Sequence, residues 1–179
     1  IRPDAGEIYV KGRRCEFHQP IEALHAGIAI VQQELSSIPD LTVAENIWLG
    51  REPRRFGFVD FKQLNRQTAE LLTDLHFDIS PSEKMRNLSV AEQQLVEIAK
   101  ALSHADADII IMDEPTDALT DTETESLFSV IRELREQGCG IVYISHRLKE
   151  IFEICDDVTV FRDGQFIGEK PVSDLTEDS

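Results

Sequence analysis

The amino-acid sequence predicts an α/β protein in which a parallel sheet is interrupted by an inserted helical section. The aliphatic run at 109–112 is typical of a central parallel strand, because such strands are buried on both faces. From residue 108 onward, strand-like and helix-like segments alternate, as they do when helices connect parallel strands. Between about 42 and 104, apolar residues instead recur every three or four positions, which predicts helices.

The start of the chain predicts a hairpin, a helix and a strand. Residues 6–17 alternate apolar and polar side chains around Lys11-Gly12, which favours a hairpin. A short helix begins at Pro20, and Gly27 suits its carboxyl-terminal cap because glycine readily adopts a left-handed backbone. The aliphatic residues 28–31 then predict a buried strand.

Capping boxes mark the starts of three further helices. In such a box, a Ser or Thr side chain and a Glu three residues later bond to each other's backbone N–H groups. The boxes begin at Thr42, Ser89 and Thr120, and Asp60 can cap one more helix. The side chains expected to face the core are Phe61, Leu64, Thr68, Leu71 and Leu75 after Asp60, and Leu95, Ile98, Ala99 and Leu102 after Ser89.

The last part of the chain returns to alternating strands and helices. The elements expected there are a strand at 108–112, a helix at 121–137, a strand at 141–144, a helix carrying Ile151 and Ile154, and strands at 158–161 and 165–167 around the turn Asp163-Gly164. The sequence thus predicts three parts. Residues 1–41 and 105–179 form the α/β core, and residues 42–104 form the helical section.

Charge and composition narrow the possible functions. The chain has 179 residues, of which 41% are hydrophobic, enough for one substantial core. Its 34 acidic and 18 basic residues give a net charge of −16, which disfavours nucleic-acid binding. The arginine-rich segment 51–55 contains proline and glutamate, and we expect a solvated loop there.

Cysteine use and hydropathy predict the compartment. The three cysteines lie far apart, which favours a reducing compartment and small apolar roles. No apolar run approaches the roughly 20 residues that span a bilayer, and no signal peptide is recognisable. We therefore expect a cytoplasmic protein that reaches a membrane only through a partner. The start at Ile1 rather than Met predicts that these residues belong to a longer chain.

Polar side chains follow the predicted strands, at the edge of the sheet where α/β proteins bind ligands. Asp113 and Glu114 end one strand, and His146 follows another. Gln33 follows a third strand, and Ser89 begins a helix, whose N-terminal N–H groups attract anions. An aspartate suits Mg²⁺ bound through water, and a glutamate suits polarising an attacking water. Each residue alone is more simply explained as a strand end, a loop residue or a cap, so their combination carries the evidence.

Four motifs, in the same order, resemble those of the ATP-binding-cassette ATPases. They are Gln33 with residues 41–46, and the segments 88–94, 109–116 and 144–147. These are similar to the Q-loop, the signature motif, the Walker B strand with its catalytic glutamate, and the switch histidine of that family. The resemblance covers essentially the whole chain. It implies a P-loop NTPase-like ABC ATPase core, truncated at its N-terminus, with an inserted α-helical subdomain.

Three further segments, at 96–102, 117–121 and 151–157, resemble the first cassette of sugar-importer ATPases, with ribose importers the most similar. This resemblance implies a subunit that couples ATP hydrolysis to uptake of ribose or a related monosaccharide. The implied partners are transmembrane permease subunits, a second cassette and, indirectly, a periplasmic sugar-binding protein. The helical section and the loop after Gln33 would contact the permease. The expected location is the cytoplasmic face of a bacterial inner membrane, as a peripheral subunit.

The resemblance also implies a role for each matching residue. Glu114 would polarise the water that attacks the γ-phosphate of ATP, and His146 would contact that phosphate and stabilise the developing charge. Asp113 and Gln33 would hold Mg²⁺, in part through water, and Gln33 would also sense the attacking water. The signature residues would clamp the nucleotide of the opposite cassette; they are Leu88, Ser89, Val90, Ala91 and Glu92.

The sequence departs from the family pattern at three places. No Gly-x-x-x-x-Gly-Lys-(Ser/Thr) phosphate loop occurs in the 179 residues, and we expect it roughly a dozen residues upstream of Ile1. Ala91 stands where the signature motif has glycine, which permits close backbone approach to phosphate. Thr120 stands where the loop after the Walker B strand ends in aspartate, which predicts different communication between two nucleotide sites.

Two other functions compete with that of a sugar-importing ATPase. A degenerate cassette would dock to partners without turnover, but such an interaction module needs none of the four residues Gln33, Asp113, Glu114 and His146. A cassette ATPase of the DNA-repair or chromosome type would carry a long coiled coil in the middle. This chain has a compact section there and an acidic net charge, which disfavour that class.

The missing phosphate loop leads to a first prediction. Because that loop supplies the lysine and the amide cradle for ATP, we expect residues 1–179 alone to bind Mg-ATP weakly and not to hydrolyse it. Calorimetric titration and a phosphate-release assay of this 179-residue chain test the expectation. Micromolar affinity for Mg-ATP would contradict it.

Overall fold

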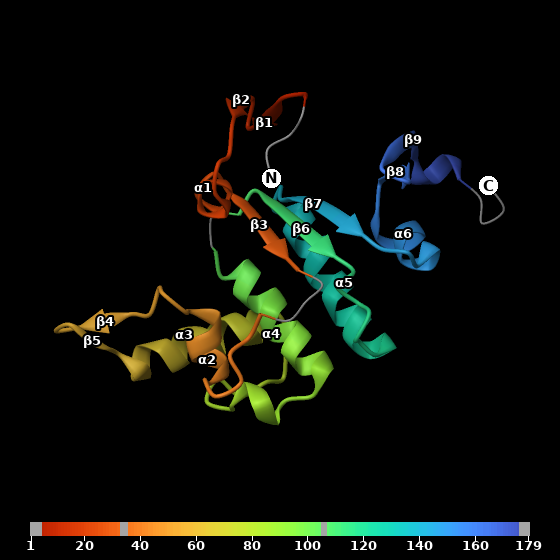
Figure 1. Ribbon diagram of the computed structural model, residues 1–179. Helices are drawn as coiled ribbons and strands as arrows, with labels where there is room; N and C mark the ends of the chain where they lie inside the picture. Colours follow the sequence, from red (N-terminus) through yellow and green to blue (C-terminus); the bar gives the residue numbers. More distant parts are fainter. Residues whose placement is uncertain (1–4, 33–35, 105–106, 176–179) are drawn as a thin grey trace.

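A computed structural model describes residues 5–32, 36–104 and 107–175. Its centre is a three-stranded parallel sheet in the order β3-β6-β7 (Figure 1). The strands are β3 (Ile28–Val31), β6 (Ile109–Asp113) and β7 (Gly140–Ile144). Ile28 of β3 and Gly140 of β7 both pair with Ile109 of β6, so the three strands run in step toward one edge. The three strands predicted at these positions are confirmed.

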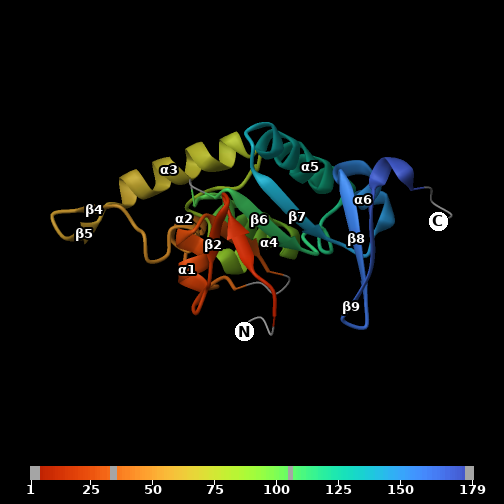
Figure 2. The ribbon, with the colours of Figure 1, turned by 90° about the horizontal axis from the view of Figure 1, so that it is seen from above.

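Hairpins lie near both ends of the chain. The strands are β1 (Ile8–Val10) with β2 (Arg13–Cys15), and β8 (Asp157–Arg162) with β9 (Gln165–Pro171). Both predicted hairpins are confirmed, and β8–β9 lies beyond the β7 side of the sheet (Figure 2). The turn residues Asp163 and Gly164 have φ values of +52° and +75°. Two positive φ values match the type I′ turn that suits the twist of a hairpin and favours Asp-Gly.

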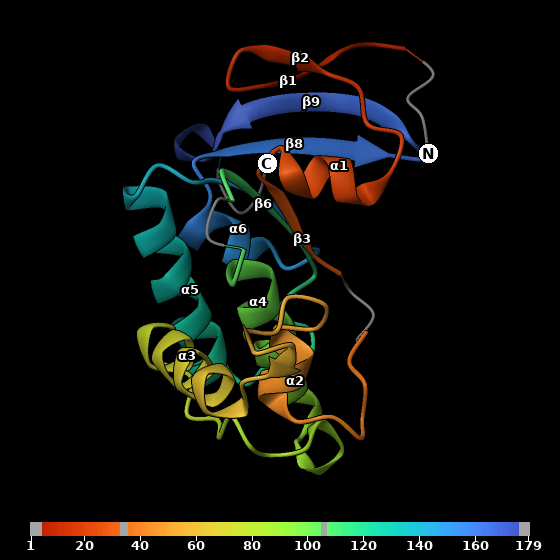
Figure 3. The same cartoon turned by 90° about the vertical axis from the view of Figure 1, so that its left-hand side faces the viewer.

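Helices fill the section between β3 and β6 and pack on the sheet, and further helices lie before β3 and after β6. Figure 3 shows α2 to α5 grouped at one end of the molecule. The helices are α1 (Pro20–His25), α2 (Val43–Ile47), α3 (Phe61–Asp74), α4 (Val90–Leu102), α5 (Asp121–Glu136) and α6 (Leu148–Ile154), with short 3₁₀ turns η1 (Met85–Asn87) and η2 (Val172–Asp174). Thr42, Ser89 and Thr120 cap α2, α4 and α5 in capping boxes, as predicted. Asp60 caps α3, also as predicted.

The helices give no sign of a membrane-spanning segment. In the described parts of the chain, none of them combines the length and the apolar character needed to cross a bilayer.

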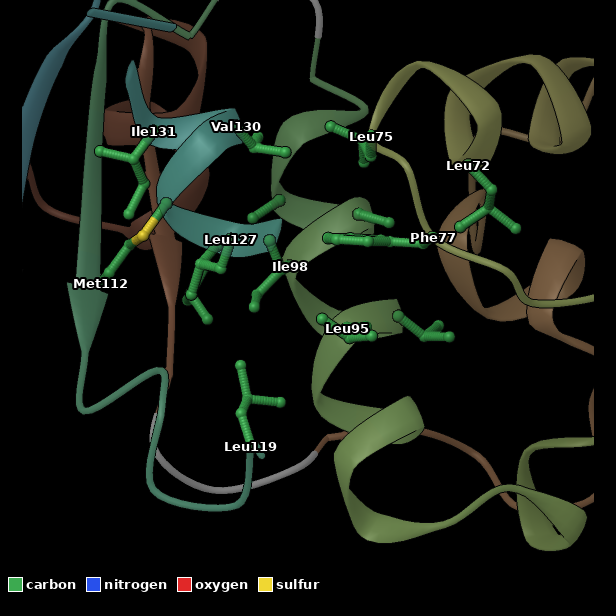
Figure 4. Packing of buried hydrophobic residues seen from close by; sticks show 14 of the residues in the cluster. Leu72, Leu75, Phe77, Leu95, Ile98, Met112, Leu119, Leu127, Val130 and Ile131 are labelled. Atoms are coloured by element: carbon green, nitrogen blue, oxygen red, sulfur yellow. The ribbon is translucent and has the colours of Figure 1, made fainter. Parts of the chain in front are cut away.

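One hydrophobic core continues from the sheet into the helical section. Figure 4 shows Met112 of β6 and Leu127 of α5 on one side of α4, and Leu72 and Phe77 on the other. Ile98 of α4 is fully buried in the same cluster. Helix α4 therefore packs against both parts and joins them into one core.

The described residues cover one face of the sheet. Ala29 and Met112 on this face are buried, whereas Ile30 and Val142 on the opposite face are 53% and 48% exposed. Ile111 of β6 also lies on the opposite face and is half-buried. The expectation that 109–112 is buried on both faces is therefore wrong for the second face within this part of the chain. Helices α4 and α5 cover the first face, as the shared core shows.

The apolar face of α3 differs in part from the predicted one. Leu64 and Thr68 are fully buried, as predicted. Leu71 was expected to face the core but is only half-buried, and its neighbour Leu72 is fully buried instead. Phe61 is exposed, because it begins the helix beyond the reach of the core. Both 71 and 72 fit the helical period, so packing against neighbours decides between them.

Arg51 is exposed, as expected for a solvated loop at 51–55, but it also makes contacts that the prediction did not include. Its guanidinium donates to the Ile47 carbonyl at 3.0 Å, and to the Ser103 carbonyl and Oγ at 3.3 and 2.7 Å. It also lies over the Trp48 ring, 5.2 Å from the centroid. Because Ile47 ends α2 and Ser103 follows α4, Arg51 joins these two helices. The short hairpin β4 (Arg54–Arg55) and β5 (Phe58–Val59) follows.

The contacts of Arg51 predict a measurable contribution to stability. We expect Arg51→Ala to lower the free energy of unfolding by about 2 kcal/mol, because it leaves acceptors on Ile47 and Ser103 without their donor and removes the contact with Trp48. Urea unfolding followed by circular dichroism measures the difference. The matched control is Arg55→Ala, an exposed arginine, which should cost less than about 0.5 kcal/mol. Equal losses in the two variants would contradict this role for Arg51.

Candidate functional site

The acidic residues and the histidine lie at the edge where the parallel strands end. β6 ends at Asp113 and β7 ends at Ile144, and these two residues pair with each other. The backbone N–H of Glu114 then donates to the Ile144 carbonyl at 2.9 Å. This bond extends the pairing by one residue. The two strands therefore deliver Glu114 and His146 to the same place.

Glu114 has a left-handed backbone with φ +48°. This conformation is uncommon for residues other than glycine and costs about 1–2 kcal/mol. It turns the chain sharply away from β6 and leaves the Glu114 side chain 24% exposed at the edge. Strained residues of this kind cluster at functional sites, so the conformation supports a chemical role for Glu114.

Glu114, His146 and Asp117 form one cluster. Nδ1 of His146 lies 3.3 Å from Oε1 of Glu114, close enough for an ion pair when the imidazole is protonated. One potential ligand atom from each of the three residues lies within 4.8 Å of the others. Asp117 was not among the predicted site residues. The available signal was its spacing, three residues after Glu114 in the turn that follows the strand.

The carboxylates at this edge suit Mg²⁺. Side chains alternate along a strand, so half-buried Asp113 shares the face of Ile111, opposite that of buried Met112. Asp113, Glu114 and Asp117 carry carboxylate oxygens, the ligand type that Mg²⁺ prefers, and those of Glu114 and Asp117 lie near each other and near His146. The donor set at the strand end therefore fits the ion that the motif predicts.

A buried carboxylate adjoins the same edge. Glu150 of α6 is 7% exposed and accepts hydrogen bonds from four side chains. The donors are Thr116 Oγ1 at 2.9 Å from both oxygens, Tyr143 Oη at 2.9 Å, Ser145 Oγ at 3.0 Å and Arg147 Nη1 at 3.2 Å. Glu150 lies outside the sequence motifs, and Thr116 is the last residue of the motif 109–116 but had no predicted role. The available signal for Glu150 is its spacing. It lies four residues before buried Ile154 and therefore on the same face of α6, which should be apolar.

Among the side chains that donate to Glu150, Tyr143 has a pKa that is clearly shifted from its ordinary value. Burial is the largest cause that raises the pKa of Tyr143 above its ordinary value of 10.0. A hydrogen bond with Thr116 opposes this rise in pKa, and the Glu150 carboxylate adds to it. The hydroxyl of Tyr143 therefore stays protonated and donates to Glu150.

The predicted signature residues lie at the N-terminus of α4. Ser89 Oγ accepts from the Glu92 N–H at 3.2 Å and donates to the Glu92 carboxylate at 2.8 Å. Ser89 and Val90 are exposed, and Leu88, Ala91 and Glu92 are half-buried. In the ranges that the structure describes, no hydrogen bond or ion pair joins 88–92 to Glu114 or His146. The structure thus brings Glu114 and His146 together but not the signature residues. The predicted Gln33 lies outside the described residues.

A hollow of about 760 Å³ opens at the opposite edge of the sheet. Gly27 and Asp108, which precede β3 and β6, line it together with Lys11, whose ammonium lies 2.7 Å from the Asp108 carboxylate. Open α/β sheets bind their ligands at the carboxyl ends of the strands instead. The candidate site therefore remains at Glu114 and His146.

The parallel sheet thus presents an acidic edge at the carboxyl ends of its strands, where open α/β sheets bind their ligands. The sequence profile of the family described as "ABC transporter" matches residues 1–117, well over half of the chain. The chain therefore belongs to the ABC transporter family. The resemblance seen in the four motifs is confirmed at this level.

Solved structures of ATP-binding cassettes share the fold. A nucleotide-free cassette from an ABC transporter gives a TM-score of 0.78 at 24% identity, over 96% of this chain and 71% of that chain. The ADP conformation of the cassette MJ1267 gives 0.77 at 25% identity, over 96% and 71%. A dimeric post-hydrolysis state of the cassette MJ0796, bound to ADP and Pi, gives 0.79 at 24% identity, over 96% and 75%. The predicted fold class, an α/β core of the P-loop NTPase-like ABC type, is confirmed.

The raised pKa of Tyr143 predicts how stability depends on pH. A group whose pKa is higher in the folded state stabilises the fold fully below its unfolded pKa, and this contribution is lost as the pH rises. We therefore expect the free energy of unfolding to fall above about pH 10, the ordinary tyrosine pKa, and to fall less in Tyr143→Phe. Urea unfolding from about pH 8 to about pH 11 measures both slopes. Identical slopes would contradict the prediction.

Proposed function

We propose that this chain is the first nucleotide-binding cassette of an ABC sugar importer, and that it hydrolyses ATP to drive uptake of ribose or a related monosaccharide. The observation that carries the proposal is the contact between Glu114 and His146 after two adjacent parallel strands. Membership of the ABC transporter family supports ATP as the nucleotide. The cargo rests on the similarity of 96–102, 117–121 and 151–157 to sugar-importer cassettes.

Glu114 and His146 divide the chemistry between water and phosphate. Glu114 is partly shielded from solvent, and its carboxylate polarises the attacking water by accepting a hydrogen bond from it. His146 is 66% exposed, so its ring is free to contact the γ-phosphate and to stabilise charge there. Their separation of 3.3 Å lets one residue orient the water and the other the phosphate that it attacks.

The remaining site residues hold the metal and the second nucleotide. Asp113 and Gln33 hold Mg²⁺, which neutralises phosphate charge when bound. Residues 88–92 clamp the ATP of the opposite cassette, using the exposed Ser89 and the N-terminal N–H groups of α4. The dimeric structure of the cassette MJ0796 supports a second cassette as partner.

We place the cassette as a peripheral subunit on the cytoplasmic face of a bacterial inner membrane. Transmembrane permease subunits bind its helical section, and a periplasmic binding protein delivers the sugar to the permease. In this arrangement 42–104 is the transmitting part, and 1–41 and 105–179 are the nucleotide-binding parts. The core that α4 shares with the sheet supports this division of labour, because it couples the two by direct packing.

A non-hydrolysing interaction module has less support. The left-handed backbone of Glu114 costs free energy, and docking alone does not require it. In the catalytic proposal this turn directs the Glu114 carboxylate away from its strand and toward His146.

Replacement of Glu114 tests the catalytic proposal. We expect Glu114→Gln, in a chain that also carries a phosphate loop, to lower ATP hydrolysis at least about a hundredfold. Nucleotide affinity should be retained, because the amide keeps the shape of the side chain but is a poor proton acceptor. Phosphate release and titration with ATP measure the two effects separately.

The matched control is Glu125→Gln, on the exposed face of α5, which should hydrolyse ATP normally. Undiminished hydrolysis in Glu114→Gln would refute the role of Glu114. Cells that carry Glu114→Gln should also lose uptake of labelled ribose. Loss of another monosaccharide with ribose uptake intact would refute ribose as the cargo.

A further inference from the structure

We propose that Glu150 is a positioning residue that sets the separation of Glu114 and His146, an inference that rests on the ATPase function proposed above. Its carboxylate joins two loops. Thr116 belongs to the loop after β6, two residues beyond Glu114, and Ser145 belongs to the loop after β7, directly before His146.

The carboxylate of Glu150 suits this task because it only accepts hydrogen bonds. An ionised carboxylate has two oxygens and no donor, and each of its four partners here is a donor. A buried charge is costly unless it is paired and hydrogen-bonded, so the donors must stay in place for Glu150 to stay buried. Thr116 is 1% exposed, and its one hydroxyl donor lies 2.9 Å from both oxygens, which limits the freedom of the loop after β6.

In the described structure, hydrogen bonds at two points connect the loop after β6 with the loop after β7; each of these connections is called a tie. The first joins the Glu114 N–H to the Ile144 carbonyl, at the base of the loops. The second is the carboxylate of Glu150, which takes a bond from Thr116 on one loop and from Ser145 on the other. One tie alone would let the loops pivot about the strand ends. Two ties at different points fix their orientation, and with it the direction of the Glu114 and His146 side chains.

Glu150 acts through other residues rather than on the nucleotide. Its carboxylate is buried and accepts hydrogen bonds from four side chains of this chain. Arg147 is positively charged and can only donate hydrogen bonds, because a guanidinium has no acceptor. If an amide replaced the carboxylate, its NH₂ group would face N–H and O–H donors. The hydroxyl groups could rotate to accept from this NH₂ group, but the Arg147 guanidinium could not.

The test uses Glu150→Gln in the same chain that carries a phosphate loop. We expect kcat for ATP hydrolysis to fall between about tenfold and about a hundredfold, with KM and nucleotide affinity unchanged, because the bound nucleotide keeps its contacts while the catalytic pair is misaligned. The ring resonance of His146, observed by NMR with isotope-labelled histidine, should shift and broaden. It is assigned by its loss in His146→Asn.

The matched control is Glu153→Gln on the same helix, where the glutamate pairs with Arg132 on the surface. It should leave kcat and the His146 resonance unchanged. Thr116→Val is a second variant that removes one tie and keeps the side-chain volume. It should reproduce the shift of the His146 resonance and lower kcat, and it keeps the test decisive if Glu150→Gln fails to fold.

Two outcomes would overturn the proposal. One is an unchanged His146 resonance in a folded Glu150→Gln or Thr116→Val chain. The other is a lower melting temperature with normal kcat, which would show a merely structural role. The resonance needs no turnover. A wild-type full chain that fails to hydrolyse ATP would refute the proposed function, and the resonance would still decide whether Glu150 positions His146.

Discussion

The parallel pairing of β6 with β7 is the constraint on which the rest of the site depends. The register runs unbroken from Ile109 with Gly140 to Asp113 with Ile144, and the N–H of Glu114 continues it. Because the side-chain period of a strand is two residues, a slip by one would turn Asp113 toward the covered face and take the aliphatic residues out of the core. The same register therefore fills the core and delivers the acids to the edge.

Helix α4 carries this order into the helical section. Its residue Ile98 packs in the cluster that holds Met112 of β6, while Leu72 of α3 joins the same cluster from the far side. Arg51 adds a polar link from α2 to the end of α4, through Ser103. The helix capped by Ser89 thus shares one core with the strand that ends in Asp113. A close-packed core transmits strain, so this shared packing couples the helical section to the sheet.

Much of the fold was predictable because its signals are local. The capping box of Ser89 involves residues three apart, and the proximity of Glu114 and His146 follows from the rule that parallel strands end at one edge. Arg51 and Glu150 escaped prediction because distant partners decide their environment. Arg51 bonds to a residue 52 positions away, and Glu150 to one 34 positions away. No local pattern distinguishes Arg51 from an ordinary surface charge. For Glu150 the one local signal is a charged residue on the apolar face of a helix.

The strained backbone of Glu114 and the buried charge of Glu150 belong to one arrangement. A left-handed glutamate persists only where its surroundings over-determine it, and here the Ile144 carbonyl holds one side while Thr116, bound to Glu150, holds the other. The buried carboxylate in turn needs donors from both loops, because an unpaired buried charge is strongly destabilising. Relaxing Glu114 would break the bond to Ile144 and draw Thr116 away from Glu150. The turn at Glu114 and the buried carboxylate of Glu150 therefore stabilise each other through Thr116.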